Sequence, residues 1–274
     1  MKLIQKLLEK HGIEQVVRSV VQARRSPPEP IRVLGLDINT NSTGFVVLNE
    51  LGGIESSGHI CTKHLQSDGQ ILDIGVEIAA RMSQVHNHEL STTPLVAWEV
   101  GIEDFLRTFS PGQFKTKGLF QLAQLNGLVS YCALTTFGVA PIHVHPTAAR
   151  HFFALKVPPG VPKKKDEIKR VVLAHAIASE PALHLPHMTI PAQFDVADAY
   201  VVASYTYWRR VVDTVIATSH PLQSALWPDM EQQLARQIAS RSAKTKSFSK
   251  HAYLQLVFRQ EVDIWVRDHR TTCW

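Results

Sequence analysis

The sequence has few cysteines, and they are far apart. Cys61, Cys132 and Cys273 are the three among 274 residues, and no CxxC pair occurs. An odd, widely spaced set excludes a disulfide framework or a zinc ribbon and is typical of a reducing compartment. Long apolar runs are missing too, since no stretch reaches the roughly 18 residues that span a bilayer. We therefore expect no membrane partner.

Several catalytic signatures are also absent. The sequence contains no P-loop and no GxGxxG fingerprint, which excludes the nucleotide sites built on those motifs. No serine or cysteine nucleophile with a positioned base is visible. Histidines are paired at His86 and His88 and at His143 and His145, but no cysteine or further histidine lies at ligand spacing, so we interpret them as surface or structural residues.

The composition is that of a soluble globular protein with a basic excess. Hydrophobic residues make up 45% and charged residues 19%. The length allows one large domain with extensions, or two small domains. The net charge of +5 favours an anionic partner. Because the Lys and Arg residues are spread along the chain and form no dominant amphipathic anchor, nucleic acid is favoured over a membrane.

The pattern divides the chain into three parts. Residues 1–25 have the spacing of an amphipathic helix with a basic face, which fits an organellar targeting segment or a docking helix that is kept. A proline-rich linker follows, and the pattern changes again near residue 216. The predicted parts are an N-terminal helix with its linker (1–30), an α/β domain (31–215) and a C-terminal helical extension (216–274).

Hydrophobic periodicity in the central part predicts an α/β layout. Residues 33–48 form an apolar strand ending in a carboxylate, a polar turn and a second apolar strand, and a third strand completes a meander. Helices and strands then alternate. Later elements are predicted as helices at 71–85, 114–136, 165–178, 194–212, 229–242 and 250–268, and strands at 94–100 and 139–145. This order predicts a mixed five-stranded sheet, three antiparallel strands and then parallel ones, flanked by helices.

Four carboxylates stand at positions where charge is costly. Asp37 ends the first strand, and Glu99 lies near the end of the fourth, which can lie beside the first. Asp195 and Asp198 are three residues apart and share one face of a helix. An unpaired charge on a buried strand costs several kcal/mol, so these acids need a partner such as Mg²⁺ or Mn²⁺. Two such ions roughly 4 Å apart would support phosphodiester hydrolysis.

Each acid also has a simpler interpretation. Asp37 could merely open the turn that follows it. Asp195 and Asp198, in the first turn of the predicted helix, could complement the positive end of the helix dipole. Glu99 on an apolar strand is harder to explain without a partner.

Taken in order, these motifs resemble a known family. Gly35-Leu36-Asp37, then Ala97-Trp98-Glu99, then Phe194-Asp195-Val196-Ala197-Asp198-Ala199 resemble the acidic tetrad of RuvC-type Holliday junction resolvases, which are nucleases of the RNase H-like fold. Residues 119–128 are similar to the family's long helix, and residues 145–165 to its strand, proline and basic loop ending in a lysine. The resemblance covers about residues 31–212, and each motif alone is unspecific.

The resemblance implies a set of site residues. Metal ligands would be Asp37, Glu99, Asp195 and Asp198, with Lys165 offsetting charge beside the scissile phosphate. Nucleic-acid contacts would come from Arg150, Lys156, Lys163, Lys164 and Lys165, and from an aromatic wedge at Phe105, with Phe109 as second choice. A solvated basic loop and an aromatic folded onto the core are the simpler alternatives. Family members act as two-fold dimers, and the helix at 114–136 would be the interface, unless its apolar face packs on its own sheet.

The leading hypothesis is a metal-dependent endonuclease that resolves four-way DNA junctions as a homodimer, using two Mg²⁺ or Mn²⁺ ions. The basic N-terminal helix suggests a mitochondrion or another organelle. One alternative is an RNase H-fold RNA-binding or assembly factor of an organellar ribonucleoprotein such as the ribosome, although a scaffold has no need of four acids. Another is a YqgF-like nuclease that processes structured RNA. Sequence does not separate DNA from RNA, because both present the same phosphates.

Overall fold

The computed structural model describes residues 2–65, 71–93, 95–104, 116–159, 165–183, 187–244 and 247–271. The chain forms two compact units. One comprises residues 26–207, and the other, the helical unit, joins residues 1–25 to residues 208–274. The two ends that the sequence analysis treated as separate extensions therefore belong to one unit. In the described part of the chain, no helix has both the length and the apolar character needed to cross a membrane.

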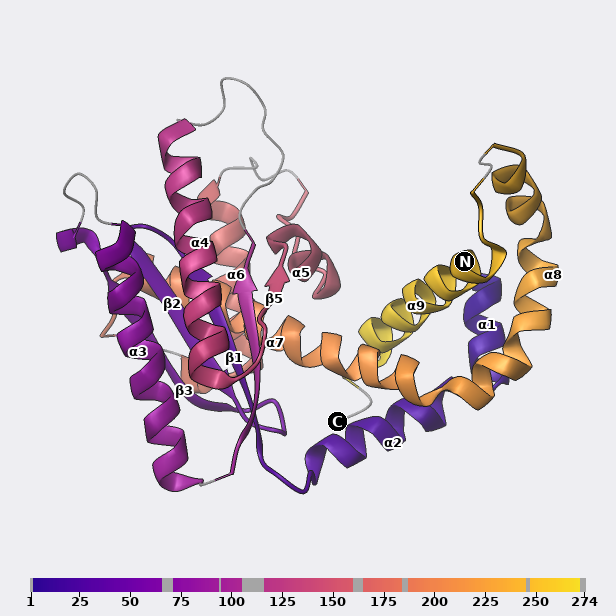
Figure 1. The fold of residues 1–274 in the computed structure, drawn as a ribbon, viewed down its shortest axis with the longest axis horizontal. Coiled ribbons are helices and arrows are strands. Elements are labelled where there is room, and N and C mark those ends of the chain that lie inside the picture. The colour runs from indigo at the N-terminus through magenta and orange to yellow at the C-terminus, as the bar shows by residue number, and fades with distance from the viewer. Residues whose placement is uncertain are drawn as a thin grey trace. The chain divides into compact units, whose positions relative to one another are not determined.

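A five-stranded sheet organises the unit of residues 26–207 (Figure 1). Its strands are β1 (Ile31–Ile38), β2 (Ser42–Leu48), β3 (Ile54–Cys61), β4 (Ala97–Glu103) and β5 (Ile142–Val144). They lie in the order β3-β2-β1-β4-β5, with β1, β2 and β3 antiparallel and with β4 and β5 parallel to β1. This topology confirms the predicted mixed sheet of three antiparallel and then parallel strands.

Helices cover both faces of this sheet. They are α3 (Ile71–Thr92), α4 (Thr116–Phe137), α5 (Pro146–Phe152), α6 (Lys165–Ser179) and α7 (Ile190–Thr218), with short 3₁₀ turns η1 (Lys63–Leu65) and η2 (Pro181–Leu183). Helices α3 and α4 pack on one face (Figure 1), where Leu34, Ile78 and Leu125 belong to one buried apolar cluster. Because side chains alternate along a strand, residues next to Leu34 face the other way, toward α7.

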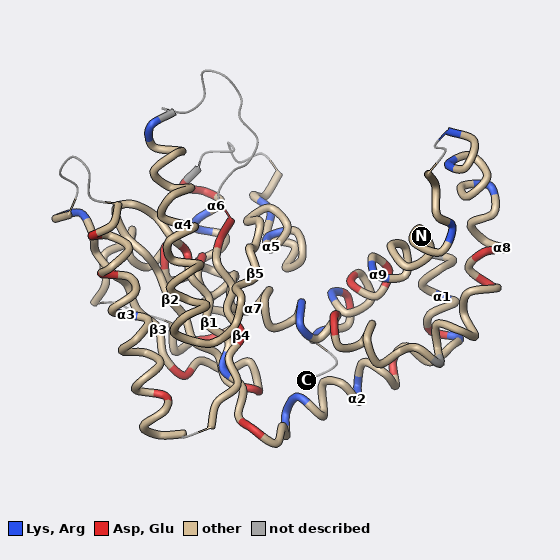
Figure 2. Tube along the Cα trace, viewed as in Figure 1, with Lys and Arg blue, Asp and Glu red and all other residues tan. Residues whose placement is uncertain are grey.

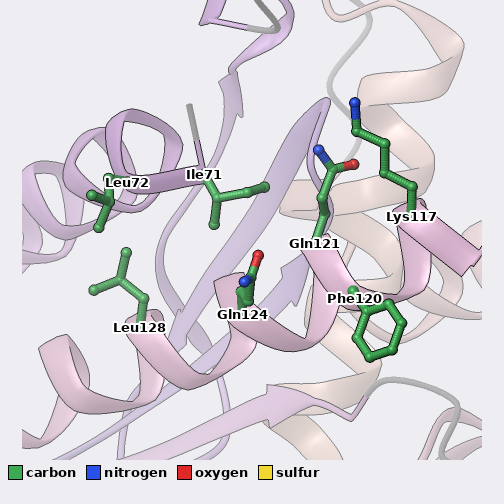
Figure 3. Close-up of a pocket in the computed structure, with 7 residues that line it drawn as sticks. All are labelled: Ile71, Leu72, Lys117, Phe120, Gln121, Gln124 and Leu128. Atoms are coloured by element: carbon green, nitrogen blue, oxygen red, sulfur yellow. The ribbon is translucent and has the colours of Figure 1, made fainter. Parts of the chain in front are cut away.

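The outer side of α4 remains apolar and exposed. Its inner residues Leu125 and Val129 are fully buried, whereas Phe120 and Tyr131 each keep 65% of their surface. A groove of about 860 Å³ lies beside this surface, where α4 approaches the start of α3 (Figure 3). Its lining residues are Ile71, Leu72, Lys117, Phe120, Gln121, Gln124 and Leu128. The sheet thus satisfies only one side of the helix that the sequence analysis considered as a dimer interface.

Three element boundaries differ from the prediction in ways that matter. The N-terminal segment is two helices, α1 (Lys2–Lys10) and α2 (Ile13–Arg25), separated at Gly12, whose φ of 85° favours glycine. Strand β4 continues past Val100 to Glu103. Helix α7 begins at Ile190, four residues before its predicted start. The last two differences change the environment of the predicted site residues.

The helical unit consists of α1, α2, the end of α7, α8 (His220–Lys244) and α9 (Lys250–His269). Leu8 of α1 is fully buried, as are Met230 of α8 and Val262 of α9. Gln5 donates a hydrogen bond of 2.9 Å to the backbone oxygen of Glu261. Residues 2–25 are therefore an integral part of this unit and not a loosely attached segment.

Candidate active site

Asp37 lies at the end of β1 on the face that α7 covers. It shares this face with Gly35, because side chains alternate along the strand. Its partner across the β1–β2 ladder is Gly44. A Cβ atom on Gly44 would lie 2.1 Å from the backbone oxygen of Asp195, so only a glycine lets α7 come this close to the sheet. The contact brings Asp195 to the strand that carries Asp37.

Two further glycines hold α7 against the sheet. A Cβ atom on Gly35 of β1 would lie 2.5 Å from the backbone oxygen of Ala199. A Cβ atom on Gly101 of β4 would lie 2.0 Å from Oγ1 of Thr206. The helix is thereby fixed with its two aspartates beside the ends of β1 and β4.

The acid beside Asp37 is Glu103, the last residue of β4. Strands β1 and β4 are parallel, with Leu36 opposite Ile102, so the next residue of each strand is one of the two acids. The two carboxyl groups are close enough for each to act on the pKa of the other.

Glu99 does not lie at this position. It stands opposite Val33, four residues before Asp37 along β1, which corresponds to about 13 Å at the usual strand rise. The sequence analysis ended the fourth strand at Val100 and therefore placed Glu99 beside Asp37, and that placement is wrong. The apolar alternation that continues to Ile102 was the signal that could have identified Glu103 instead.

Asp195 and Asp198 lie in the second and third turns of α7. The first turn of this helix contains no acidic residue. Complementation of the helix dipole, which acts within the first turn, therefore does not explain them. Both residues are buried, with 8% and 6% of their surface exposed. Such burial requires that their charges be compensated.

The Asp195 carboxylate is held by polar residues of the neighbouring strands. Ser42 at the start of β2 donates a hydrogen bond of 2.6 Å to Oδ2. His59 of β3 places Nε2 3.4 Å from the same oxygen. His59 pairs with Gly44 across the β2–β3 ladder, so the same glycine gives both the helix and the histidine access to this point. The sequence analysis did not identify Ser42 or His59.

Two basic residues neutralise the α7 aspartates. Lys169 of α6 places Nζ 3.6 Å from Oδ1 of Asp195 and 3.9 Å from Oδ2 of Asp198. Arg150 of α5 donates from Nη2 to Oδ1 of Asp198 at 3.4 Å. Arg150 was predicted near the phosphate, and the structure places it beside the acids. Lys169 was not predicted, although it lies one helical turn after the predicted Lys165.

Burial and mutual repulsion strongly perturb the strand acids. Loss of contact with water raises the pKa of the Asp37 carboxyl well above its usual value. The charges of Glu103, Asp198 and Asp195 raise this pKa further. Lys169 acts in the opposite direction and lowers it. Asp37 therefore favours its protonated form in the absence of an additional cation.

The same forces act on Glu103 and Asp198. Burial, followed by the charge of Asp198, raises the pKa of Glu103 to about 7. Arg150 and the hydrogen bond from Asp37 lower this pKa but do not offset the burial. Burial also raises the pKa of Asp198, against the opposing effects of Arg150 and Lys169. A cluster of acids with raised pKa values is characteristic of a functional site.

The donor set fits a hard divalent cation, although the side chains are not arranged as a finished metal site. Among the described residues, no group of three or more His, Cys, Asp or Glu side chains is positioned to hold a metal ion. The acids instead form two pairs, Asp37 with Glu103 at the strand ends and Asp195 with Asp198, which Lys169 bridges. Carboxylate oxygens are nevertheless the ligands that Mg²⁺ and Mn²⁺ prefer. A cation would compensate the repulsion that now raises the pKa values of Asp37 and Glu103.

Several predicted residues fall outside this description. Phe105, Phe109, Lys163, Lys164 and the side chain of Lys165 lie outside the described part of the chain. Lys156 is described and exposed, in the segment that follows α5. The predicted wedge and basic loop therefore remain predictions.

Comparison with known proteins gives only structural similarities. No family model matches the sequence. No curated protein matches it. The fold is similar to that of T. thermophilus RuvC in complex with Holliday junction substrate, with 16% identity and a TM-score of 0.43 over 66% of this chain and 95% of that chain. It is also similar to the yeast mitochondrial Holliday junction resolvase Ydc2, with 14% identity and a TM-score of 0.40 over 81% of this chain and 98% of that chain. At these identities the similarity concerns the fold alone.

Proposed function

We propose that this protein is a metal-dependent endonuclease that hydrolyses phosphodiester bonds in branched DNA and resolves four-way junctions. The observation that carries the proposal is the meeting of four carboxyl groups from β1, β4 and α7 with two basic side chains among them. Such a cluster is costly to bury, and apolar residues in its place would make the fold more stable. Its cost is explained if the site binds cations and phosphate.

The acids would hold the metal. Asp37, Glu103, Asp195 and Asp198 are the ligands we propose for Mg²⁺ or Mn²⁺, which when bound activates a water molecule and stabilises the leaving oxygen. Burial raises the pKa values of Asp37 and Glu103, so any proton that they hold must be released before both can act as ligands. Metal binding is therefore coupled to proton release at this pair.

The basic residues would act on the phosphate. Lys169 and Arg150 reach the acids from α6 and α5, so a phosphate bound at the acids would lie within their reach. Their positive charge would stabilise the additional negative charge of the transition state. Ser42 and His59 would orient the Asp195 carboxylate through the contacts described above. Lys165 stays a prediction for the same phosphate.

A homodimer is part of the proposal. A four-way junction is two-fold symmetric, and symmetric cutting requires two active sites. The exposed outer side of α4, with Phe120, Tyr131 and Leu134, offers an apolar surface for a second copy. An organellar location stays a prediction from the basic N-terminal segment. The burial of residues in α1 and α2 supports a segment that is kept as part of the helical unit.

The decisive experiment compares two glutamates of one strand. The purified full chain, Glu103→Gln and the matched control Glu99→Gln are incubated with Mg²⁺ or Mn²⁺ and a labelled four-way DNA junction, a linear duplex or a structured RNA. We expect symmetric nicking of the junction by the wild type and by Glu99→Gln, and a loss of at least 100-fold in Glu103→Gln. Metal binding, measured by calorimetry, should weaken in parallel.

Other outcomes point to the alternatives. Cutting confined to the RNA would favour an RNA-processing nuclease. Binding of nucleic acid without cleavage by the wild type would favour an RNA-binding or assembly factor. Equal activity of Glu103→Gln and the wild type would contradict the proposed metal site.

A further inference from the structure

The basic charge of this protein is concentrated in the helical unit. Residues 1–25 and 208–274 contain 16 Lys and Arg against 8 Asp and Glu. Residues 26–207 contain 13 Lys and Arg against 16 Asp and Glu, so the unit with the candidate active site carries a net negative charge. A positive surface outside a catalytic unit of net negative charge would add affinity for a polyanion.

Within the helical unit, the longest stretch of sequence without an acid covers the second half of α8 and the segment after it. Residues 232–260 contain no acid and six Lys and Arg residues. Figure 2 shows the blue segments gathered there, beyond the last red segment of α8. A groove of about 540 Å³ lies on this part of α8. Its lining residues, which we name the α8 basic surface, are Arg236, Gln237, Ser240, Arg241 and Lys244.

These cations are available to a ligand. Arg236, Arg241 and Lys244 are all exposed. Arg236 and Lys244 have no ion-pair partner in the ranges that the structure describes. The nearest acid in the sequence, Glu231, pairs with Lys250 at 3.1 Å. The other lining residues, Gln237 and Ser240, carry polar side chains. Arg, Lys, Gln and Ser are side chains that commonly contact phosphate groups of nucleic acids.

One cation is also fixed in direction. The Arg241 guanidinium lies 4.8 Å from the centroid of the Tyr253 ring of α9. Tyr253 is itself anchored, because its hydroxyl donates a hydrogen bond of 2.7 Å to Gln237. The Arg241 side chain would therefore lose little conformational freedom when it binds a ligand.

We infer that the α8 basic surface binds the sugar–phosphate backbone of a duplex arm of the DNA substrate, an inference that rests on the proposed function. A membrane surface fits less well, because an interfacial helix inserts exposed apolar side chains beside its cations. The apolar residues Leu226, Met230 and Leu234 of α8 are buried instead. Contacts to phosphates carry no information on the DNA sequence. This surface would therefore raise the affinity for DNA of any sequence.

The test uses the full chain and two charge-matched variants. Arg236→Gln with Lys244→Gln removes two cations of the surface and leaves the Arg241–Tyr253 contact intact. Lys10→Gln with Arg18→Gln is the control, since both side chains are exposed but pair with Asp229 and Glu14. Binding to a labelled four-way junction and a linear duplex is measured in EDTA at several salt concentrations, and melting curves check folding.

We expect the surface variant to lose about tenfold or more in affinity at 0.1 M salt for both DNAs, with a salt slope shallower by about 2. The control should stay within about twofold of the wild type. An unchanged affinity and salt slope in the surface variant overturns the inference. Binding to anionic phospholipid vesicles is measured as well, and a variant that loses vesicle binding but keeps DNA binding also overturns it. If the wild type cuts no junction but the variant still loses DNA binding, the proposed function fails and this surface stands. If junctions are cut and DNA binding is unaffected, the inference alone fails.

Discussion

Asp37 and Glu103 lie beside each other at the ends of two parallel strands, and each acts on the pKa of the other. Helix α7 places Asp195 and Asp198 next to them, and burying these four acids has a cost in stability that apolar side chains would not have. The site is therefore a place where the fold gives up stability. Three predictions concern this arrangement and the packing around it, and a fourth concerns the helical unit.

Removing the charge of Glu103 should stabilise the metal-free protein at alkaline pH. Its pKa is raised from 4.5 to about 7, so the folded chain holds this proton more tightly than the unfolded chain. The associated stability is fully present below the unfolded value and is lost as the pH rises through the folded value, by about 3 kcal/mol at most. Glu103→Gln should melt at a higher temperature than the wild type at pH 8 in EDTA, with little difference at pH 4.5.

Magnesium provides the control for this effect. A cation bound by the acids stabilises the folded state by mass action, so it should raise the melting temperature of the wild type at pH 8. The same addition should change that of Glu103→Gln much less. A Glu103→Gln variant that melts no higher than the wild type at pH 8 in EDTA would contradict the assigned cost of burying this charge.

Gly44 should be intolerant of even one methyl group. A Cβ atom there would lie 2.1 Å from the backbone oxygen of Asp195, so Gly44→Ala must displace α7 from the sheet. We expect a loss of about 1–3 kcal/mol in unfolding free energy and a fall in junction cleavage by at least 100-fold. Gly127→Ala is the control, because a Cβ atom at Gly127 of α4 meets nothing within 4 Å. That change should be neutral or stabilising, by up to about 1 kcal/mol. A fully active Gly44→Ala would show that the close contact is not required.

Lys169 should contribute to the chemical step more than to folding. It lies 3.6 Å from Asp195 and 3.9 Å from Asp198, whereas the neighbouring Arg170 pairs with Glu167 on the exposed side of α6. We expect Lys169→Gln to lower the single-turnover cleavage rate about 100-fold, in line with the loss of one charge-stabilising group. Arg170→Gln should cleave normally. Similar rates for the two variants would assign Lys169 a structural role only.

The N-terminal helices should be required for a stable helical unit. Leu8 is completely buried in that unit, so Leu8→Ala should cost about 2–5 kcal/mol. Leu3 of the same helix keeps 52% of its surface, and Leu3→Ala serves as the control. Thermal unfolding should show the loss of stability, and hydrogen exchange should show faster exchange of the amides of α1, α8 and α9. An unaltered exchange of α8 and α9 in Leu8→Ala would mean that α1 is dispensable.

The sequence by itself determined the type and order of the main elements. Apolar residues that alternate in strands and recur at helical spacing predict the mixed sheet and its flanking helices, since burial imposes these periods directly. The same reasoning identified Asp37, Asp195 and Asp198, because an acid within an apolar element is visible in the sequence alone. Arg150 was suggested by the family resemblance, and the structure places it beside Asp198.

Tertiary structure decided which side chains meet. The second strand acid depends on the register of β1 against β4, and a shift of four residues separates Glu99 from Glu103. Lys169 reaches the acids only through the packing of α6 beside α7, and residues 1–25 join residues 208–274 only in the folded chain. Register, close approach at glycines and contacts between distant segments arise from long-range packing, and no local pattern of residues encodes them.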